Sequence, residues 1–191
     1  MNKRITTQQI VGTGLLLALE ILFQIIGNYL QFGEVNINIT LVTIVLGAVM
    51  YGPLSGAILG FFNGVVTLFS PSTLALFMTV NPAGTVIACL AKCTIAGLVA
   101  GFVFRLFKDK NRILGLIIAG LLVPIINTGI FAVCALIFFR PILERFQGDF
   151  PNIYAFLIIG FIGINFIVEV VVTPLLSTLL GTIVLKKDNR Q

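Results

Sequence analysis

The stretch "GTVIACLAKCTIAGLVAGFVFRLF", residues 84–107, decides the fold class of this chain. It is apolar apart from small hydroxyl and thiol side chains, Lys92 in its first half and Arg105 near its end. About 20 consecutive apolar residues suffice for an α-helix to cross the hydrocarbon part of a bilayer. The stretch therefore predicts a membrane-spanning helix. Lys92 has apolar neighbours on both sides, which raises the question of which negative group its ammonium meets.

The remainder of the chain has the same character. Hydrophobic residues make up 58% of the 191 residues, charged residues make up 10%, and the mean hydropathy is +1.12. A soluble domain of this size cannot bury so much apolar surface. The composition predicts an all-α integral membrane protein, a compact single-domain bundle of six transmembrane helices over residues 1–191. The six predicted spans are 8–29, 38–53, 54–70, 84–107, 112–139 and 153–185.

The positive charges predict the orientation of this bundle. With six spans, three basic clusters fall on one side of the membrane: Lys3, Arg4, Arg105, Lys108, Lys110, Arg112, Lys186, Lys187 and Arg190. Only Arg140 and Arg145 fall on the other side. Cytoplasmic loops of membrane proteins carry an excess of lysine and arginine, so both termini are expected in the cytoplasm. The net charge of +5 then reflects topology, and no nucleic-acid partner is expected.

A few polar side chains lie inside the predicted spans, where they are costly and usually face the interior of a bundle. They are Glu20, Asn63, Lys92, Asn127, Asn165 and Glu169. At a rise of 1.5 Å per residue, most of them lie about 10–18 Å below the outer ends of their helices. Glu169 follows Asn165 by four residues, one turn deeper on the same face. The spacing therefore predicts a polar layer in the outer half of the membrane.

Two interpretations of this layer are open. In the first, Lys92 pairs with Glu169 or Glu20 and the asparagines hold the helices together. In the second, the layer lines an outward-facing cavity, Lys92 holds a substrate carboxylate, and the asparagines bind amide or hydroxyl groups. The candidate binding residues are Lys92, Asn127, Asn165, Glu169, Asn63 and Asn81. The external segment 70–83 has an apolar middle, which suits either a lid over such a site or a position in the membrane interface.

The residue inventory argues against an enzyme. The chain has no histidine, no serine in a nucleophile elbow and no phosphate-binding loop, so no catalytic residue is assigned and the chain alone cannot use ATP. Cys89, Cys93 and Cys134 lie within spans and are expected to be small packing residues, with no metal or cofactor site. Glycines recur every four residues from position 52 to 64 and again at 97 and 101, which predicts close helix packing within the chain.

Three stretches resemble the substrate-binding S components of energy-coupling-factor (ECF) transporters. They are "VNINITLVTIVLGAVMYGPLSGAILGFFNGVV", "TVNPAGTVIACLAKCTIAGLVAGFVFRLF" and "VPIINTGIFAVCALIFF". The likeness runs from about residue 10 to residue 185. It implies a multi-pass protein of the prokaryotic cell membrane that binds a vitamin in its outer half. It also implies docking on a transmembrane coupling protein (the T component) with two cytoplasmic ATPases, which consume the ATP.

The resemblance extends to docking and substrate. The family's helix 1 signature is Ala-x-x-x-Ala, and the nearest match is Gly14 to Ala18, which keeps the face small. The Lys92 and "VPIINTGIF" contexts are most similar to the pantothenate group. Folate, riboflavin and hydroxymethylpyrimidine remain alternative substrates. A carrier of another class, an ion-coupled secondary transporter using Glu20 or Glu169, also remains open, although no internal repeat supports it.

Overall fold

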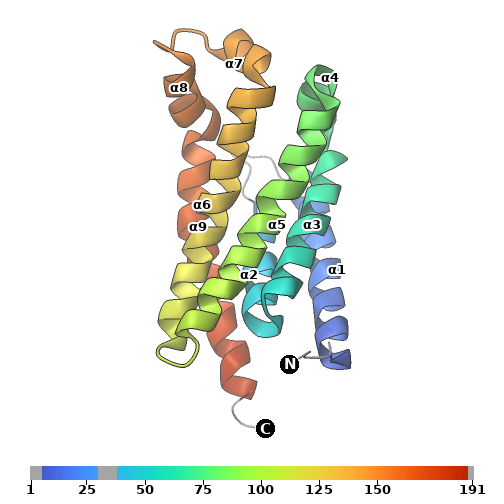
Figure 1. Cartoon of the computed structure of the whole chain (residues 1–191), viewed down its shortest axis with the longest axis vertical. Coiled ribbons are helices and arrows are strands. Elements are labelled where there is room, and N and C mark those ends of the chain that lie inside the picture. Colours follow the sequence, from blue (N-terminus) through green and yellow to red (C-terminus); the bar gives the residue numbers. More distant parts are fainter. Residues whose placement is uncertain (1–5, 30–37, 189–191) are drawn as a thin grey trace.

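A computed structural model describes residues 6–29 and 38–188, and every element in these ranges is helical (Figure 1). This confirms the all-α fold. The elements in chain order are α1 (Thr7–Tyr29), α2 (Thr40–Tyr51), α3 (Pro53–Leu68), η1 (Thr73–Phe77), α4 (Met78–Val80), α5 (Pro82–Phe107), α6 (Arg112–Phe138), α7 (Arg140–Phe146), α8 (Ile153–Ala155), η2 (Phe156–Ile162) and α9 (Gly163–Asp188). The two η elements are π-helical turns.

Four described helices are long and apolar enough to cross a membrane: Thr7–Gly27, Pro82–Phe107, Arg112–Phe138 and the continuous stretch Ile153–Val184. A fifth is obtained when α3 and the following Thr73–Val80 segment, bent by 68°, are taken as one span. The chain is therefore a membrane-embedded protein.

Helix α2 differs from the span predicted over residues 38–53. It has 12 residues, and ten consecutive ones, Thr40 to Val49, are buried. An apolar helix of this length is typical of a protein core rather than of a lipid-facing span. In agreement with this, α2 contacts α1, α3, α5, α6 and α9. The short helix thus lies at the centre of the bundle, and the longer helices pack around it.

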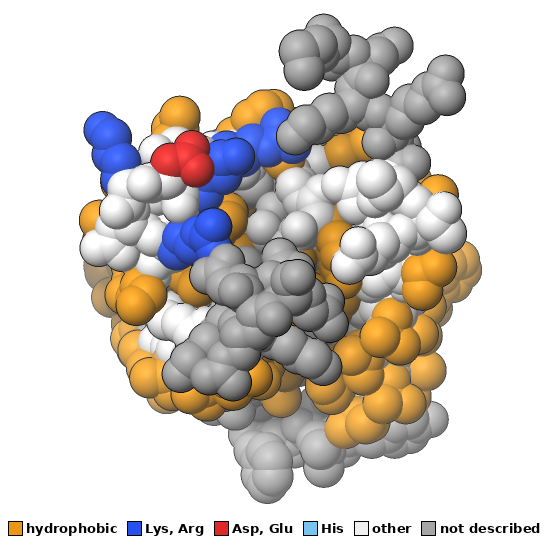
Figure 2. Space-filling model, turned by 90° about the horizontal axis from the view of Figure 1, so that it is seen from below, with side chains coloured by type: hydrophobic (Ala, Val, Ile, Leu, Met, Phe, Trp, Pro, Cys, Tyr) orange, Lys and Arg blue, Asp and Glu red, His pale blue; other side chains and the backbone are white. Residues whose placement is uncertain are grey.

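The two ends of the bundle differ. The beginning of α1, the turn between α5 and α6 and the end of α9 lie at one end, and α7 and α8 lie at the other (Figure 1). Lysine and arginine side chains gather at the first end (Figure 2), where the α5–α6 turn brings together Arg105, Lys108, Lys110 and Arg112. The beginning of α1, the α5–α6 turn and the end of α9 therefore share one end of the bundle, while the basic side chains at residues 3–4 and 186–190 lie outside what the structure describes.

The glycine stripe of α3 packs against α5. A Cβ atom on Gly56, Gly60 or Gly64 would collide, respectively, with the backbone carbonyl oxygens of Gly97, Cys93 and Cys89. Glycine thus allows the two backbones to approach closely, which confirms the expected packing within the chain. Gly52, between α2 and α3, has a further reason to be glycine, because its φ of 99° lies in the left-handed region.

We expect Gly60→Ala to lower the stability of the protein, because the new methyl group meets the backbone of α5 and overpacking of this kind costs about 1–3 kcal/mol. Gly129→Ala in α6 is the matched control, since its Cβ would meet no atom within 4 Å and the exchange should be neutral or stabilising. Thermal unfolding in detergent measures both. Equal melting temperatures for the two variants would contradict close α3–α5 packing.

Candidate functional site

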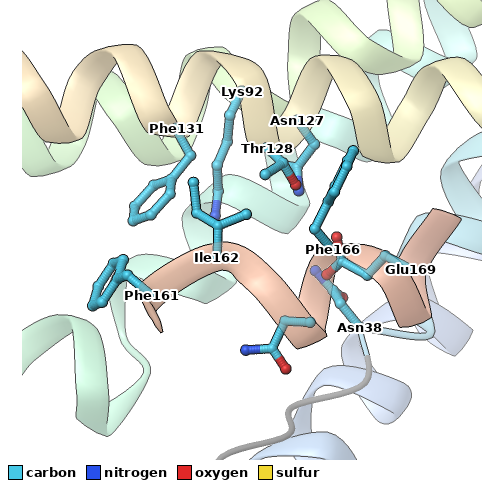
Figure 3. A pocket seen from close by; sticks show the side chains of 10 residues that line it. Asn38, Lys92, Asn127, Thr128, Phe131, Phe161, Ile162, Phe166 and Glu169 are labelled. Carbon is cyan, nitrogen blue, oxygen red and sulfur yellow. The ribbon is translucent and has the colours of Figure 1, made fainter. Parts of the chain in front are cut away.

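A pocket with a volume of about 150 Å³ lies between α5, α6 and the last span (Figure 3). Four of the predicted binding residues line it: Lys92, Asn127, Asn165 and Glu169. Six further residues complete the lining: Asn38, Thr128, Phe131, Phe161, Ile162 and Phe166. The structure therefore brings together polar groups from α5, α6 and α9 inside an otherwise apolar bundle.

Helical spacing explains how each wall is built. On α6, Asn127 and Phe131 are four residues apart and so share one face. On α9, Asn165 and Glu169 repeat this spacing. Phe161 and Ile162 belong to η2, at the point where the π-helical turn gives way to α9. π-Helical turns within longer helices often occur at functional sites.

Lys92 points into the pocket (Figure 3) and is partly buried. Its ammonium lies 5.3 Å from the centroid of the Phe131 ring, within the range of a cation–π interaction. No carboxylate of the described residues comes within ion-pair distance of it. The structure thus shows no direct ion pair of Lys92 with Glu20 or Glu169, although Lys92 acts electrostatically on the Glu169 carboxyl group.

Glu169 occupies a different part of the same pocket. Figure 3 shows Phe131 and Phe161 towards one end, and Glu169 with Asn38 towards the other. Only 9% of the Glu169 surface is exposed, and the Thr128 side chain lies beside its carboxyl group. The pocket thus has a cationic group near its aromatic end and a carboxyl group at the far end.

A buried hydrogen-bond network supports the pocket from behind. The Cys93 thiol lies 3.1 Å from Oδ1 of Asn127 and 3.2 Å from Oδ1 of Asn63. The Asn63 amide in turn donates to Oγ1 of Thr40 over 2.6 Å. Asn63, predicted as a binding residue, is therefore separated from the pocket by Cys93 and positions Asn127. Cys93 does more than pack, since it contacts both amides.

Two other polar residues singled out in the sequence do not line the pocket. Glu20 is 2% exposed and accepts a hydrogen bond from Oγ1 of Thr43 over 3.4 Å. Asn63 lies near it, yet Oε1 of Glu20 has no hydrogen-bond partner. Asn81 caps α5, with its Oδ1 accepting from the backbone N–H of Gly84 over 2.9 Å. Asn81, predicted as a binding residue, thus caps a helix and does not line the pocket.

The family of the chain follows from a comparison with protein-family models. The model described as "ECF transporter, substrate-specific component" matches residues 8–177. The chain belongs to this family. The match covers every pocket residue, and comparisons with curated proteins and with solved structures gave no match. This S component is accordingly a substrate-binding transporter subunit and not an enzyme. Among the described residues, no group of three or more His, Cys, Asp and Glu side chains is arranged to hold a metal ion.

The aromatic residues at the pocket of the S component were not among the binding residues predicted from the sequence. Phe77 on η1 packs against Phe131 and Phe161, with ring centroids 5.8 and 6.2 Å away. The rings of Phe131 and Phe161 are themselves nearly parallel at 6.1 Å. The apolar middle of segment 70–83 thus packs on two residues that line the pocket. A usable signal existed, because Phe131 and Phe161 each lie four residues from a predicted polar residue.

The predicted docking residues lie on the outer side of α1. Gly14 and Ala18 are both exposed, and a Cβ atom added to Gly14 would meet nothing within 4 Å. Helix α1 packs on α2 and α3 through other faces, which include the buried Thr13 and Glu20. Gly14 and Ala18 are therefore not used for packing within the chain, in contrast to the glycines of α3.

Proposed function

We propose that this S component captures a small anionic vitamin, with pantothenate as the best candidate, in the pocket around Lys92. The observation that carries the proposal is the Lys92 ammonium, which points into the pocket without a carboxylate at ion-pair distance among the described residues. A charged group inside a membrane protein needs a partner. A substrate carboxylate is the natural partner for a lysine that lines a binding pocket.

The lining of the pocket favours pantothenate over the alternatives, and its size counts against folate. Pantothenate has one carboxylate, one amide and two hydroxyls, which suits Lys92 together with Asn127 and Asn165. Riboflavin and hydroxymethylpyrimidine have no carboxylate. Folate has carboxylates but is much larger, and a cavity of about 150 Å³ suits a compact ligand better.

We place the pocket in the outer half of a six-span protein in the prokaryotic plasma membrane, with both termini in the cytoplasm. The basic α5–α6 turn supports this orientation, because it lies at the same end of the bundle as the beginning of α1 and the end of α9. Asn127 lies 11 residues before the end of α6 at Phe138, or about 16 Å along the helix from the opposite end of the bundle. In this proposal the buried α2 is counted as a short span enclosed by the other helices, and α3 with its bent continuation is counted as one span, which gives six.

In this proposal the vitamin moves only when the S component docks through α1 on a T component that carries two ATPases. The S component itself supplies recognition. The exposed small-residue face at Gly14 and Ala18 supports docking, because two helices approach closely where no long side chains stand between them.

Native mass spectrometry of the purified protein, followed by calorimetric titration with pantothenate, tests the proposal. We expect either a co-purified mass equal to that of pantothenate or saturable binding by the emptied protein. Folate, riboflavin and hydroxymethylpyrimidine are each titrated separately, because they are the alternative substrates. A folded protein that binds none of the four would contradict the proposed function.

A further inference from the structure

Two groups of opposite charge share the pocket without pairing. Lys92 lies over the Phe131 ring, and Glu169 lies beside Thr128 at the other end. Both belong to the described residues, and their charged atoms are more than 4.0 Å apart, since no ion pair joins them. The helices α5 and α9 thus hold the two groups beyond ion-pair distance, although Lys92 still acts electrostatically on the Glu169 carboxyl group.

A ligand whose only polar group is a carboxylate would match Lys92 but not Glu169. Its carboxylate would meet Lys92, but the largely buried Glu169 would then be a second acceptor group in the same small pocket. Like charges repel more strongly in such surroundings than in water. Thr128 lies beside the Glu169 carboxyl group as one donor, and a carboxylate can accept several hydrogen bonds. A ligand that brings a further donor to Glu169 therefore binds more tightly than one that brings only a second negative charge.

The amide between these groups adds a third requirement. Oδ1 of Asn127 faces the Cys93 thiol, which leaves the amide nitrogen of Asn127, a hydrogen-bond donor, for the ligand. Along the pocket, the protein thus offers two donors, Lys92 and Asn127, and then an acceptor, Glu169. A complementary ligand has acceptors at the Lys92 end and a donor at the Glu169 end.

We infer that Glu169 is a specificity-determining residue that selects carboxylate ligands carrying a hydroxyl or ammonium donor at the end opposite the carboxylate. This inference rests on the proposed function and deepens it. It assigns the carboxylate of the ligand to Lys92 and its donor group to Glu169. Simple apolar carboxylates are disfavoured because they bring a second negative group near Glu169 and no donor to it.

Four small-molecule ligands test separately the need for a carboxylate and the need for a donor group. Pantothenate carries the carboxylate and hydroxyls. N-pivaloyl-β-alanine keeps the carboxylate and amide but lacks both hydroxyls, and panthenol keeps the hydroxyls but replaces the carboxylate with an alcohol. β-Alanyl-β-alanine carries an ammonium as the donor. Each is titrated by calorimetry into the wild-type protein and into the near-isosteric variant Glu169→Gln.

We expect N-pivaloyl-β-alanine and panthenol each to bind about 10- to 100-fold more weakly than pantothenate, as for loss of a hydrogen bond to a charged group. Glu169→Gln should weaken pantothenate by a similar factor, because only pantothenate presents a donor, and should strengthen N-pivaloyl-β-alanine, because the repulsion between its carboxylate and Glu169 is removed. Stronger binding of β-alanyl-β-alanine than of N-pivaloyl-β-alanine, lost in Glu169→Gln, would identify ammonium as an accepted donor.

Other outcomes overturn the inference in distinguishable ways. If N-pivaloyl-β-alanine binds as tightly as pantothenate, or if Glu169→Gln weakens both equally, Glu169 does not read a donor, while the proposed function stands. If the wild-type protein binds riboflavin or hydroxymethylpyrimidine instead of pantothenate, the carboxylate requirement fails but a vitamin-binding S component remains. If it binds no vitamin at all, both the inference and the proposed function fail.

Discussion

Lys92→Met is expected to weaken pantothenate binding by about 100-fold or more, because a substrate carboxylate would enter the pocket without its cationic partner. Removing one member of a buried, hydrogen-bonded charge pair typically costs about 2–5 kcal/mol. Methionine retains most of the length of the lysine stem and its contact with Phe131, so the change is mainly one of charge. Calorimetric titration of the purified variant measures the loss.

The ligand-free protein provides the control for this prediction. Lys92 forms no ion pair with the described residues, so Lys92→Met should leave the melting temperature of the empty protein nearly unchanged. Lys110→Met, on the exposed basic turn, should change neither binding nor stability. Unchanged affinity in Lys92→Met would remove this residue from the site. A strongly lowered melting temperature would mean that Lys92 balances an acid of its own chain.

The polar part of the site could be predicted because polar groups are rare and costly in membrane spans. Lys92, Asn127, Asn165 and Glu169 stood out for this reason, and all four line the pocket. The phenylalanines could not be found in the same way. The chain has 17 of them, and an apolar ring facing lipid looks the same in sequence as one facing a cavity.

The position of Asn63 shows what else the sequence does not reveal. Its depth in the membrane agreed with a pocket residue, but depth says nothing about which helix stands between a side chain and the cavity. The glycines of α3 draw this helix against α5, so Cys93 of α5 comes between Asn63 and Asn127. The short α2 posed a similar difficulty, because hydropathy alone does not distinguish a buried helix from a lipid-facing one.

The ends of the helices were easier to predict than the neighbours that each helix face contacts. Asn81 and Asn111 cap α5 and α6 with side-chain hydrogen bonds, and both predicted spans begin within two residues of the observed helices. The π-helical turns η1 and η2 carry no such signal. Phe161 of η2 lines the pocket and Phe77 of η1 packs against it, so the least predictable backbone lies beside the candidate site.

A double variant, Gly14→Phe with Ala18→Phe, should abolish vitamin uptake by cells while leaving binding to the purified S component unchanged. Both positions are exposed on the outer side of α1, and Gly14 has open space around it, so phenylalanine rings there would project into lipid rather than into the bundle. They would hold a docking helix away from the close approach that small residues permit.

Three measurements test this prediction together: uptake of labelled pantothenate, calorimetric binding, and co-purification of the S component with the T component and ATPases. Gly129→Phe, an exposed glycine of α6 with the same open space, is the matched control and should support normal uptake. If the α1 variant loses binding as well as uptake, α1 supports the pocket from within the chain. If it loses neither, docking uses another face. Loss of uptake and of the complex, with binding retained, separates the recognition surface of the protein from the surface that couples it to ATP hydrolysis.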